Sequence, residues 1–160
     1  MNRRAFPEFQ LPTLENRAVT QAGFQQRPAT LCLFFKGSCA TSQLVLNLLR
    51  QLWERQGLPE EWVLLISQDN VPETRTFVQQ HGLSFPLVVD YPDYRLSRAL
   101  DFQTVPAMYL VDRQSRILNH TEGFVKPEYE ILLQRLFAEN GVQIVELFES
   151  GANVPLLKPG

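Results

Sequence analysis

Two short, almost wholly apolar runs constrain most strongly how this chain can fold, and the first of them is broken only by Thr30. They cover residues 29–35 and 62–66. Such runs are typical of strands in a sheet that is covered on both faces. Between them, over residues 41–55, apolar side chains recur at helical spacing. Alternation of buried strands with amphipathic helices predicts an α/β protein.

The rest of the sequence continues this alternation within one domain. Of the 160 residues, 44% are hydrophobic, which is enough for a single core. We expect a domain over 1–141, with its core at about 6–138, and a C-terminal tail over 142–160 that packs on the domain or trails from it. The further predicted elements are an extended N-terminal arm (6–12 and 17–20), a helix at about 70–80, a strand at 85–89, a short helix at 94–100, a hairpin (107–111 and 117–120), a helix from Pro127 to Asn140, and a strand at 143–148 in the tail.

Charge and hydropathy exclude several classes of partner. The formal net charge is −2 and there is no basic block, so we expect neither nucleic acid nor an anionic membrane as a partner. The first four residues carry two arginines but no apolar stretch follows them, unlike a signal peptide. No apolar run approaches the ~18 residues of a membrane helix. The sequence therefore predicts a soluble, cytoplasmic protein without a membrane segment.

The two cysteines, Cys32 and Cys39, have different surroundings. Cys32 lies inside the apolar run 29–35, where it is expected to be a small buried hydrophobe. If this strand continues to Phe35, the two Cα atoms lie beyond the roughly 7 Å that an unstrained disulfide spans. The histidines and cysteines do not have the spacing of a zinc site, and no metal site is predicted. Cys39 is the remaining candidate.

Cys39 follows a turn at Gly37-Ser38 and precedes the predicted helix. A strand that ends there delivers the chain to the carboxyl edge of the sheet, where ligand sites of α/β folds gather. At the first turn of a helix, unpaired backbone N–H groups and the helix dipole stabilise a thiolate. Since the thiolate is the attacking species in thiol exchange, Cys39 is the predicted catalytic residue. The hydroxyls of Thr41 and Ser42 are expected to form hydrogen bonds at this helix start.

Several segments, in order, resemble the thioredoxin-fold proteins of the TlpA / AhpC-TSA type over about residues 6–138. They are FQLPTLEN (9–16), FFKGSCATS (34–42), ISQD (66–69), FPLVVD (85–90), Val105-Pro106 and the hairpin from Leu110 to Ile117. The resemblance implies a thioredoxin-like fold, with a central mixed sheet flanked by helices, and no cofactor. It also implies that Pro106 is a cis-proline opposite Cys39. Val105, Ser38, Thr41 and Phe124 would then line a groove for a substrate peptide.

The site departs from the family pattern at one position. The family usually carries Cys-x-x-Cys, whereas Ser42 occupies the position of the second, resolving cysteine. A natural variant and an engineered Cys→Ser trap would both have this sequence. The expected activity is therefore monothiol exchange: Cys39 forms a mixed disulfide with a protein or a small thiol, and a glutathione-like or thioredoxin-like donor releases it.

Two alternatives to this thiol-disulfide oxidoreductase remain open. The first is a redox-inactive thioredoxin-fold binding module that keeps the peptide groove. The second is a peroxide-reducing antioxidant protein of the AhpC-TSA type. The peroxidase motif Pro-x-x-x-Thr-x-x-Cys disfavours the second, because Cys32 and Lys36 stand where it has proline and threonine.

Overall fold

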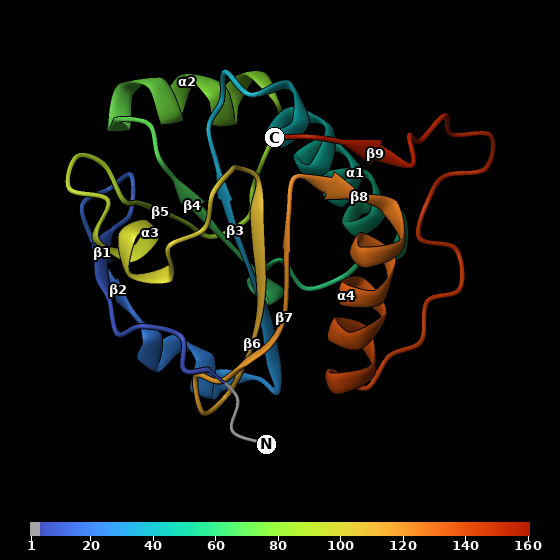
Figure 1. Ribbon diagram of the computed structural model, residues 1–160, viewed down its shortest axis with the longest axis horizontal. Helices are drawn as coiled ribbons and strands as arrows, with labels where there is room; N and C mark the ends of the chain where they lie inside the picture. The colour runs from blue at the N-terminus through green and yellow to red at the C-terminus, as the bar shows by residue number, and fades with distance from the viewer. Residues whose placement is uncertain (1–3) are drawn as a thin grey trace.

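A mixed sheet of five strands lies at the centre of the molecule (Figure 1). The computed structural model describes residues 4–160, so residues 1–3 of the segment compared above with a signal peptide lie outside the described part. The strand order is β5-β4-β3-β6-β7. Parallel pairs join β3 to β4 and β4 to β5, and antiparallel pairs join β3 to β6 and β6 to β7. The strand bounds are Ala29–Phe35 (β3), Val63–Ser67 (β4), Leu87–Val89 (β5), Ala107–Asp112 (β6) and Ile117–Glu122 (β7).

Helices cover both faces of this sheet. On one face lie α1 (Ala40–Gln56) and α4 (Lys126–Glu139), together with the buried side of α2 (Val71–Gln80). On the other lie α3 (Arg95–Leu100) and the N-terminal segment. The predicted thioredoxin-like α/β architecture is therefore confirmed.

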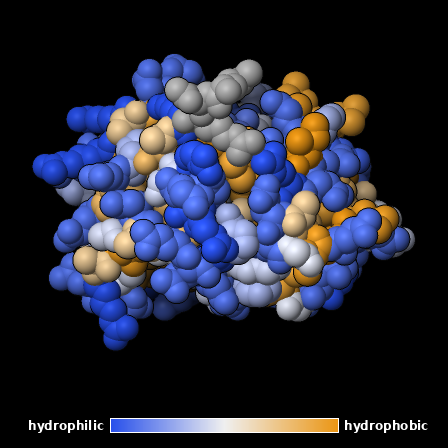
Figure 2. All heavy atoms as spheres, turned by 90° about the horizontal axis from the view of Figure 1, so that it is seen from below, coloured by the Kyte–Doolittle hydropathy of each residue, from blue (hydrophilic) through white to orange (hydrophobic). Residues whose placement is uncertain are grey.

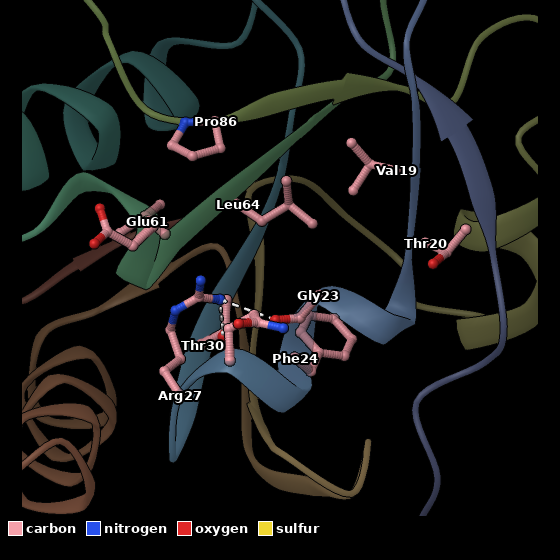
Figure 3. A pocket seen from close by; sticks show the side chains of 11 residues that line it. Val19, Thr20, Gly23, Phe24, Arg27, Thr30, Glu61, Leu64 and Pro86 are labelled. Carbon is pink, nitrogen blue, oxygen red and sulfur yellow. Dashed lines mark hydrogen bonds between the residues drawn. The ribbon is translucent and has the colours of Figure 1, made fainter.

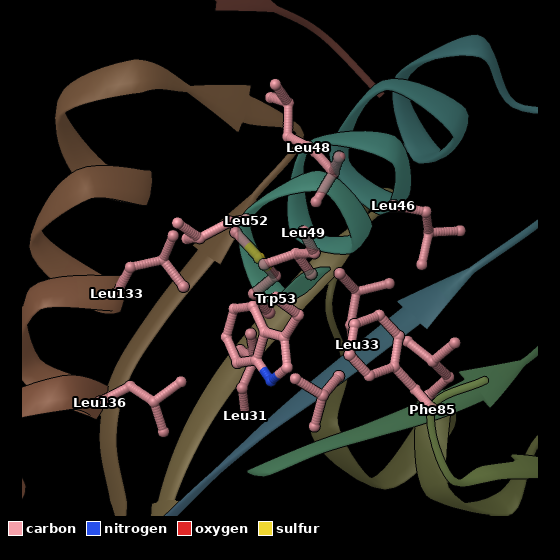
Figure 4. Packing of buried hydrophobic residues seen from close by; sticks show 14 of the residues in the cluster. Leu31, Leu33, Leu46, Leu48, Leu49, Leu52, Trp53, Phe85, Leu133 and Leu136 are labelled. Atoms are coloured by element: carbon pink, nitrogen blue, oxygen red, sulfur yellow. The ribbon is translucent and has the colours of Figure 1, made fainter. Parts of the chain in front are cut away.

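Side chains of β3 alternate between these two faces, as the pleat of a strand requires. Leu31 and Leu33 pack against α1 and α4, in a cluster that includes Leu49 of α1 and Leu133 of α4 (Figure 4). Cys32 and Phe34 point to the opposite cluster. Every residue of β3 is buried. This two-sided burial explains why the strand appears in the sequence as a run that is apolar at every position except Thr30.

The N-terminal segment covers the second face. It contains the predicted extended arm, here a hairpin of β1 (Gln10–Pro12) and β2 (Ala18–Thr20), followed by the 3₁₀ helix η1 (Gln21–Gln26). Phe6, Phe9 and Phe24 pack edge to face or tilted against one another in this layer. The face of the molecule shown in Figure 2 is mainly hydrophilic, with scattered hydrophobic side chains.

The tail differs from the prediction at residues 143–148, which form no strand. Ile144 and Leu147 are buried against the core, and the backbone carbonyls of Ile144 and Glu146 accept hydrogen bonds from Gln134 of α4 and Arg55 of α1. The segment therefore packs against two helices, where no strand edge offers it a ladder of backbone partners. The apolar residues Ile144 and Leu147 suggest a strand in the sequence, but they are buried by packing against the core and not by pairing in a sheet.

Two short strands that the sequence analysis did not foresee bring the end of the tail back to the domain. They are β8 (Phe124–Val125) and β9 (Leu157–Lys158), which pair antiparallel. In Figure 1 the red strand β9 runs back toward the region where α1 begins. The division into a domain over 1–141 and a tail over 142–160 stays a prediction.

Candidate functional site

The turn between β3 and α1 holds the candidate cysteine in a fixed backbone. The N–H of Gly37 donates to Oδ2 of Asp69 at 2.8 Å, and the side-chain amide of Gln43 donates to the carbonyl of Gly37 at 2.7 Å. A Cβ on residue 37 would lie 2.8 Å from Cδ2 of Phe77, so only glycine fits without displacing that ring. Two polar side chains and one close contact thus define the path of the chain into α1.

Cys39 is the N-cap residue of α1 and is half-buried. Its Sγ accepts a hydrogen bond from the backbone N–H of Ser42, at 3.4 Å. This donor is one of the unpaired N–H groups of the first helical turn, and it favours negative charge on the sulfur. The arrangement places the thiol where the sequence predicted it and in contact with a donor that suits a thiolate.

The loop before β6 lies opposite the thiol. Val105 and Pro106 are joined by a cis peptide bond, as expected. In the thiol form Cys39 donates to the carbonyl oxygen of Val105, with a distance of 3.6 Å between Sγ and the oxygen. The carbonyl of Pro106 accepts from the N–H of Gly123 at 2.8 Å. Thus β3–α1 and the loop before β6 form the two sides of one site.

The predicted groove residues differ in their exposure to solvent. Ser38 is exposed beside Cys39, and Thr41 and Ser42 are buried at the start of α1. The hydroxyl oxygen of Ser42 accepts from the N–H of Lys36 at 3.5 Å, so it closes the turn. The expectation that Phe124 lines a groove requires correction for its side chain. That ring is fully buried, with its centroid 5.2 Å from that of the Tyr129 ring, and the backbone of Phe124 pairs with Lys158 of β9.

Cys32 and Cys39 are both free thiols. Cys32 is fully buried on β3, and burial raises the pKa of its thiol far above the ordinary value, because the interior disfavours the charged form. Cys32 is therefore inert as a nucleophile. Cys39 therefore supplies the single reactive thiol of this site.

Three features of the site escaped the sequence analysis. Asp69, which ends the segment ISQD of the family resemblance but was given no role in the site, fixes the turn at Gly37. Glu122, at the end of β7, accepts hydrogen bonds from the backbone N–H groups of Gln103 and Thr104. The available signal was a carboxylate at the end of a strand for Glu122, and two residues after the end of a strand for Asp69.

The third feature is the tail. The hydroxyl of Thr41 donates to the carbonyl of Pro159. A Cβ on residue 160 would overlap the carbonyl oxygen of Val105 and the hydroxyl of Thr104, so Gly160 lies directly against the loop that faces the thiol. The composition of this segment gave no signal of this contact, because it contains no residue that marks chemistry.

A separate small cavity of about 170 Å³ lies near the beginning of β3, away from the cysteine, which follows the end of that strand. Phe24, Leu64 and Pro86 give it an apolar lining, with Arg27 and Thr30 at one side (Figure 3). Within residues 4–160 no three histidine, cysteine or acidic side chains cluster as metal ligands would. No helix in this range has the length and hydropathy to cross a membrane.

Comparison with solved structures supports the fold. The chain superposes on a protein assigned as the thiol:disulfide interchange protein DsbE from Chlorobium tepidum with a TM-score of 0.73 and 20% identity, covering 88% of this chain and 99% of that chain. For a protein assigned as a disulfide isomerase from Bacteroides thetaiotaomicron, the TM-score is 0.74 at 16% identity, with 88% and 90% covered. A thiol-disulfide oxidoreductase from Bacteroides fragilis gives 0.69 at 18%, with 83% and 99% covered.

Comparison of sequences identifies the family. No curated protein sequence matches the chain. The sequence model of the AhpC/TSA family matches residues 3–120, which span the sheet through β6 and most of β7, Cys39 and the cis-proline loop. The chain belongs to the AhpC/TSA family, with the thioredoxin-like fold.

Proposed function

We propose that this protein catalyses thiol–disulfide exchange through Cys39 alone. The observation that carries the proposal is the position of the sulfur. It accepts a backbone N–H of the first turn of α1 at 3.4 Å and lies 3.6 Å from the carbonyl of Val105, with no second thiol at position 42. The first contact favours a thiolate, and the second places the sulfur against the backbone that would flank a bound peptide.

The exchange takes two steps. The thiolate of Cys39 attacks one sulfur of a substrate disulfide, forms a mixed disulfide with it and expels the other sulfur as a thiolate. Because Ser42 cannot attack this mixed disulfide, an external thiolate does so. That attack regenerates Cys39 and gives a new disulfide between the donor and the substrate sulfur. Complete reduction of the substrate consumes a second donor thiol, and the two donor molecules leave joined by a disulfide.

The donor is expected to be a small thiol such as glutathione, or a thioredoxin-like protein. A reducing compartment such as the cytoplasm would supply it. Cys39 is half-buried, so its sulfur can be reached by a disulfide that is exposed on the surface of the substrate. No cofactor is needed, since both electrons come from thiols.

Reduction of insulin disulfides tests the role of Ser42. With dithiothreitol as donor, the wild-type protein is expected to accelerate insulin precipitation only weakly. Ser42→Cys should increase the rate, because position 42 already meets Cys39 through the first turn of the helix. The matched control is the double variant Cys39→Ser, Ser42→Cys, which keeps one thiol in the site but lacks the nucleophile. If Ser42→Cys and this double variant are equally inactive, the assignment of Cys39 is wrong.

The two alternatives give different results in related assays. A redox-inactive binding module would form no mixed disulfide between Cys39 and glutathione. A peroxide-reducing protein would consume peroxide rapidly and accumulate sulfenic acid at Cys39. Neither the proline nor the threonine of the peroxidase motif is present before Cys39, which favours thiol exchange.

A further inference from the structure

The end of the tail lies against β8 and against Thr41 and Val105 beside Cys39. β9 adds to the edge of β8 as an antiparallel strand, with Lys158 opposite Phe124 and Leu157 opposite Val125. The N–H of Lys126 donates to the carbonyl of Leu156 at 2.9 Å. Addition of a strand to a free edge is a general way in which proteins bind extended peptides.

Beyond β9 the chain continues into the site itself. Thr41, two residues after Cys39, donates its hydroxyl to the carbonyl of Pro159. Gly160 lies against the carbonyl of Val105, the same group that Cys39 contacts. A second glycine, Gly123, also lies close to the segment, since a Cβ there would lie 3.2 Å from the backbone nitrogen of Gly160. The tail is thus fitted between β8 and the loop that faces the thiol.

This segment is held mainly by contacts of its backbone, and its side chains bury little surface. Leu156 and Leu157 expose 73% and 64% of their surface, so their side chains add little apolar burial. Farther upstream, Val154 packs against the core cluster and Ile144 and Leu147 belong to it. A segment with few buried apolar contacts opens at low free energy, whereas the anchored part stays in place. Because backbone groups are the same in every polypeptide, a surface that binds the tail through its backbone can also bind segments of other sequence.

We propose that residues 157–160 are an intramolecular occupant of a polypeptide-binding surface formed by β8, Thr41 and Val105. A substrate polypeptide in extended conformation displaces them and adds to β8 in their place, with a small residue against Val105. The inference rests on the proposed function and deepens it, because it assigns residues 157–160 as a displaceable segment that regulates the access of polypeptides to Cys39. It also predicts that the observed rate with a peptide is reduced by the fraction of molecules in which the tail is closed.

The test compares two disulfide reagents on the chain of 160 residues. One is 4,4′-dithiodipyridine. The other is a ten-residue unstructured peptide whose single cysteine carries a 2-thiopyridyl group. In each reaction the thiolate of Cys39 forms a mixed disulfide and releases a thiopyridone, which is measured by its absorbance. Cys32 does not interfere, because it is fully buried.

Gly160→Ala is the informative variant, since its Cβ would overlap the carbonyl of Val105 and the contact between the end of the tail and this loop must open. Gly23→Ala is the matched control, because a Cβ there meets no atom within 4 Å. We expect Gly160→Ala to increase the rate with the peptide reagent about tenfold, and the rate with the small reagent much less. Gly23→Ala should change neither rate. A peptide rate in Gly160→Ala within about twofold of wild type overturns the inference.

A binding measurement separates this inference from the proposed function. A fluorescent synthetic peptide with the sequence of residues 152–160 should bind to Gly160→Ala and not to wild type, whether or not Cys39 reacts. If Cys39 reacts with neither reagent in any variant, the proposed function fails, and the binding result then decides the inference. Equal binding of the peptide to both proteins, or no binding to either, overturns it.

Discussion

Glu122 holds the loop that contains the cis peptide bond, and we expect its removal to loosen that loop. One carboxylate oxygen, Oε1, accepts from the N–H of Gln103 at 2.7 Å and from the N–H of Thr104 at 3.2 Å. The other oxygen lies 3.0 Å from Nε2 of His120. Glu122→Ala removes all three contacts. Because Thr104 directly precedes Val105, the same carboxylate also sets the position of the carbonyl beside the thiol.

The structure sets the size of the effect. A hydrogen bond to a charged group contributes about 1.5–3 kcal/mol, so the two backbone contacts of Glu122 sum to about 3 kcal/mol at the low end of that range. Its side chain is 25% exposed and Gln103 is exposed, so water replaces part of this stabilisation when the carboxylate is lost. We therefore expect Glu122→Ala to lower the free energy of unfolding by about 2 kcal/mol.

Urea denaturation followed by circular dichroism measures this difference. Glu15→Ala, at an exposed position in the turn between β1 and β2, is the matched control and should change little. Glu122→Gln keeps one acceptor for the loop and should fall between wild type and Glu122→Ala. The reasoning is refuted if Glu122→Ala lies within about 0.5 kcal/mol of wild type, the usual range for surface substitutions.

Three further substitutions test other parts of the structure. Gly37→Ala should destabilise the protein by about 1–3 kcal/mol, because the added methyl group must displace the ring of Phe77, and urea denaturation should show the loss. Leu49→Ala, at a fully buried position, should cost about 2–5 kcal/mol in the same measurement, and a smaller change would mean that α1 packs loosely. Burial lowers the pKa of His120, which stacks on Tyr109, and outweighs the nearby carboxylate. The unfolded chain then binds the proton more tightly, so this contribution to stability is complete above about pH 6.5 and is lost as the pH falls from there through the lower folded pKa. His120→Gln should remove that part of the pH dependence.

Much of the fold could be predicted because burial on both faces leaves a direct trace in the sequence. The run 29–35 became β3, and the helical pattern over 41–55 became α1 with nearly the same bounds. Local signals also fixed helix ends: the Asn70 side chain caps α2, and Gly57 ends α1 in a left-handed conformation. These features depend on residues close in sequence, which is why they can be read without a structure.

The features that escaped prediction depend on contacts distant in sequence. Glu122 binds a loop 18 residues earlier in the chain, and Thr41 binds Pro159, 118 residues away. The contact of the tail with the site was harder still to predict, because it is made through backbone groups, which are the same in every sequence. Its strand at 143–148 was wrong for a related reason. A short apolar pattern does not reveal whether a sheet edge or two helices will cover it.

The central claim is that Cys39 starts thiol exchange and cannot complete it alone, and intact mass spectrometry tests this most directly. Reduced protein is incubated with oxidised glutathione, freed of excess reagent and weighed with and without added reduced glutathione. We predict one glutathione on Cys39 that remains until the external thiol is added, whereas in Ser42→Cys the adduct gives way to an internal disulfide. Absence of glutathione from Cys39, or its loss from the wild-type protein without an external thiol, would contradict the account.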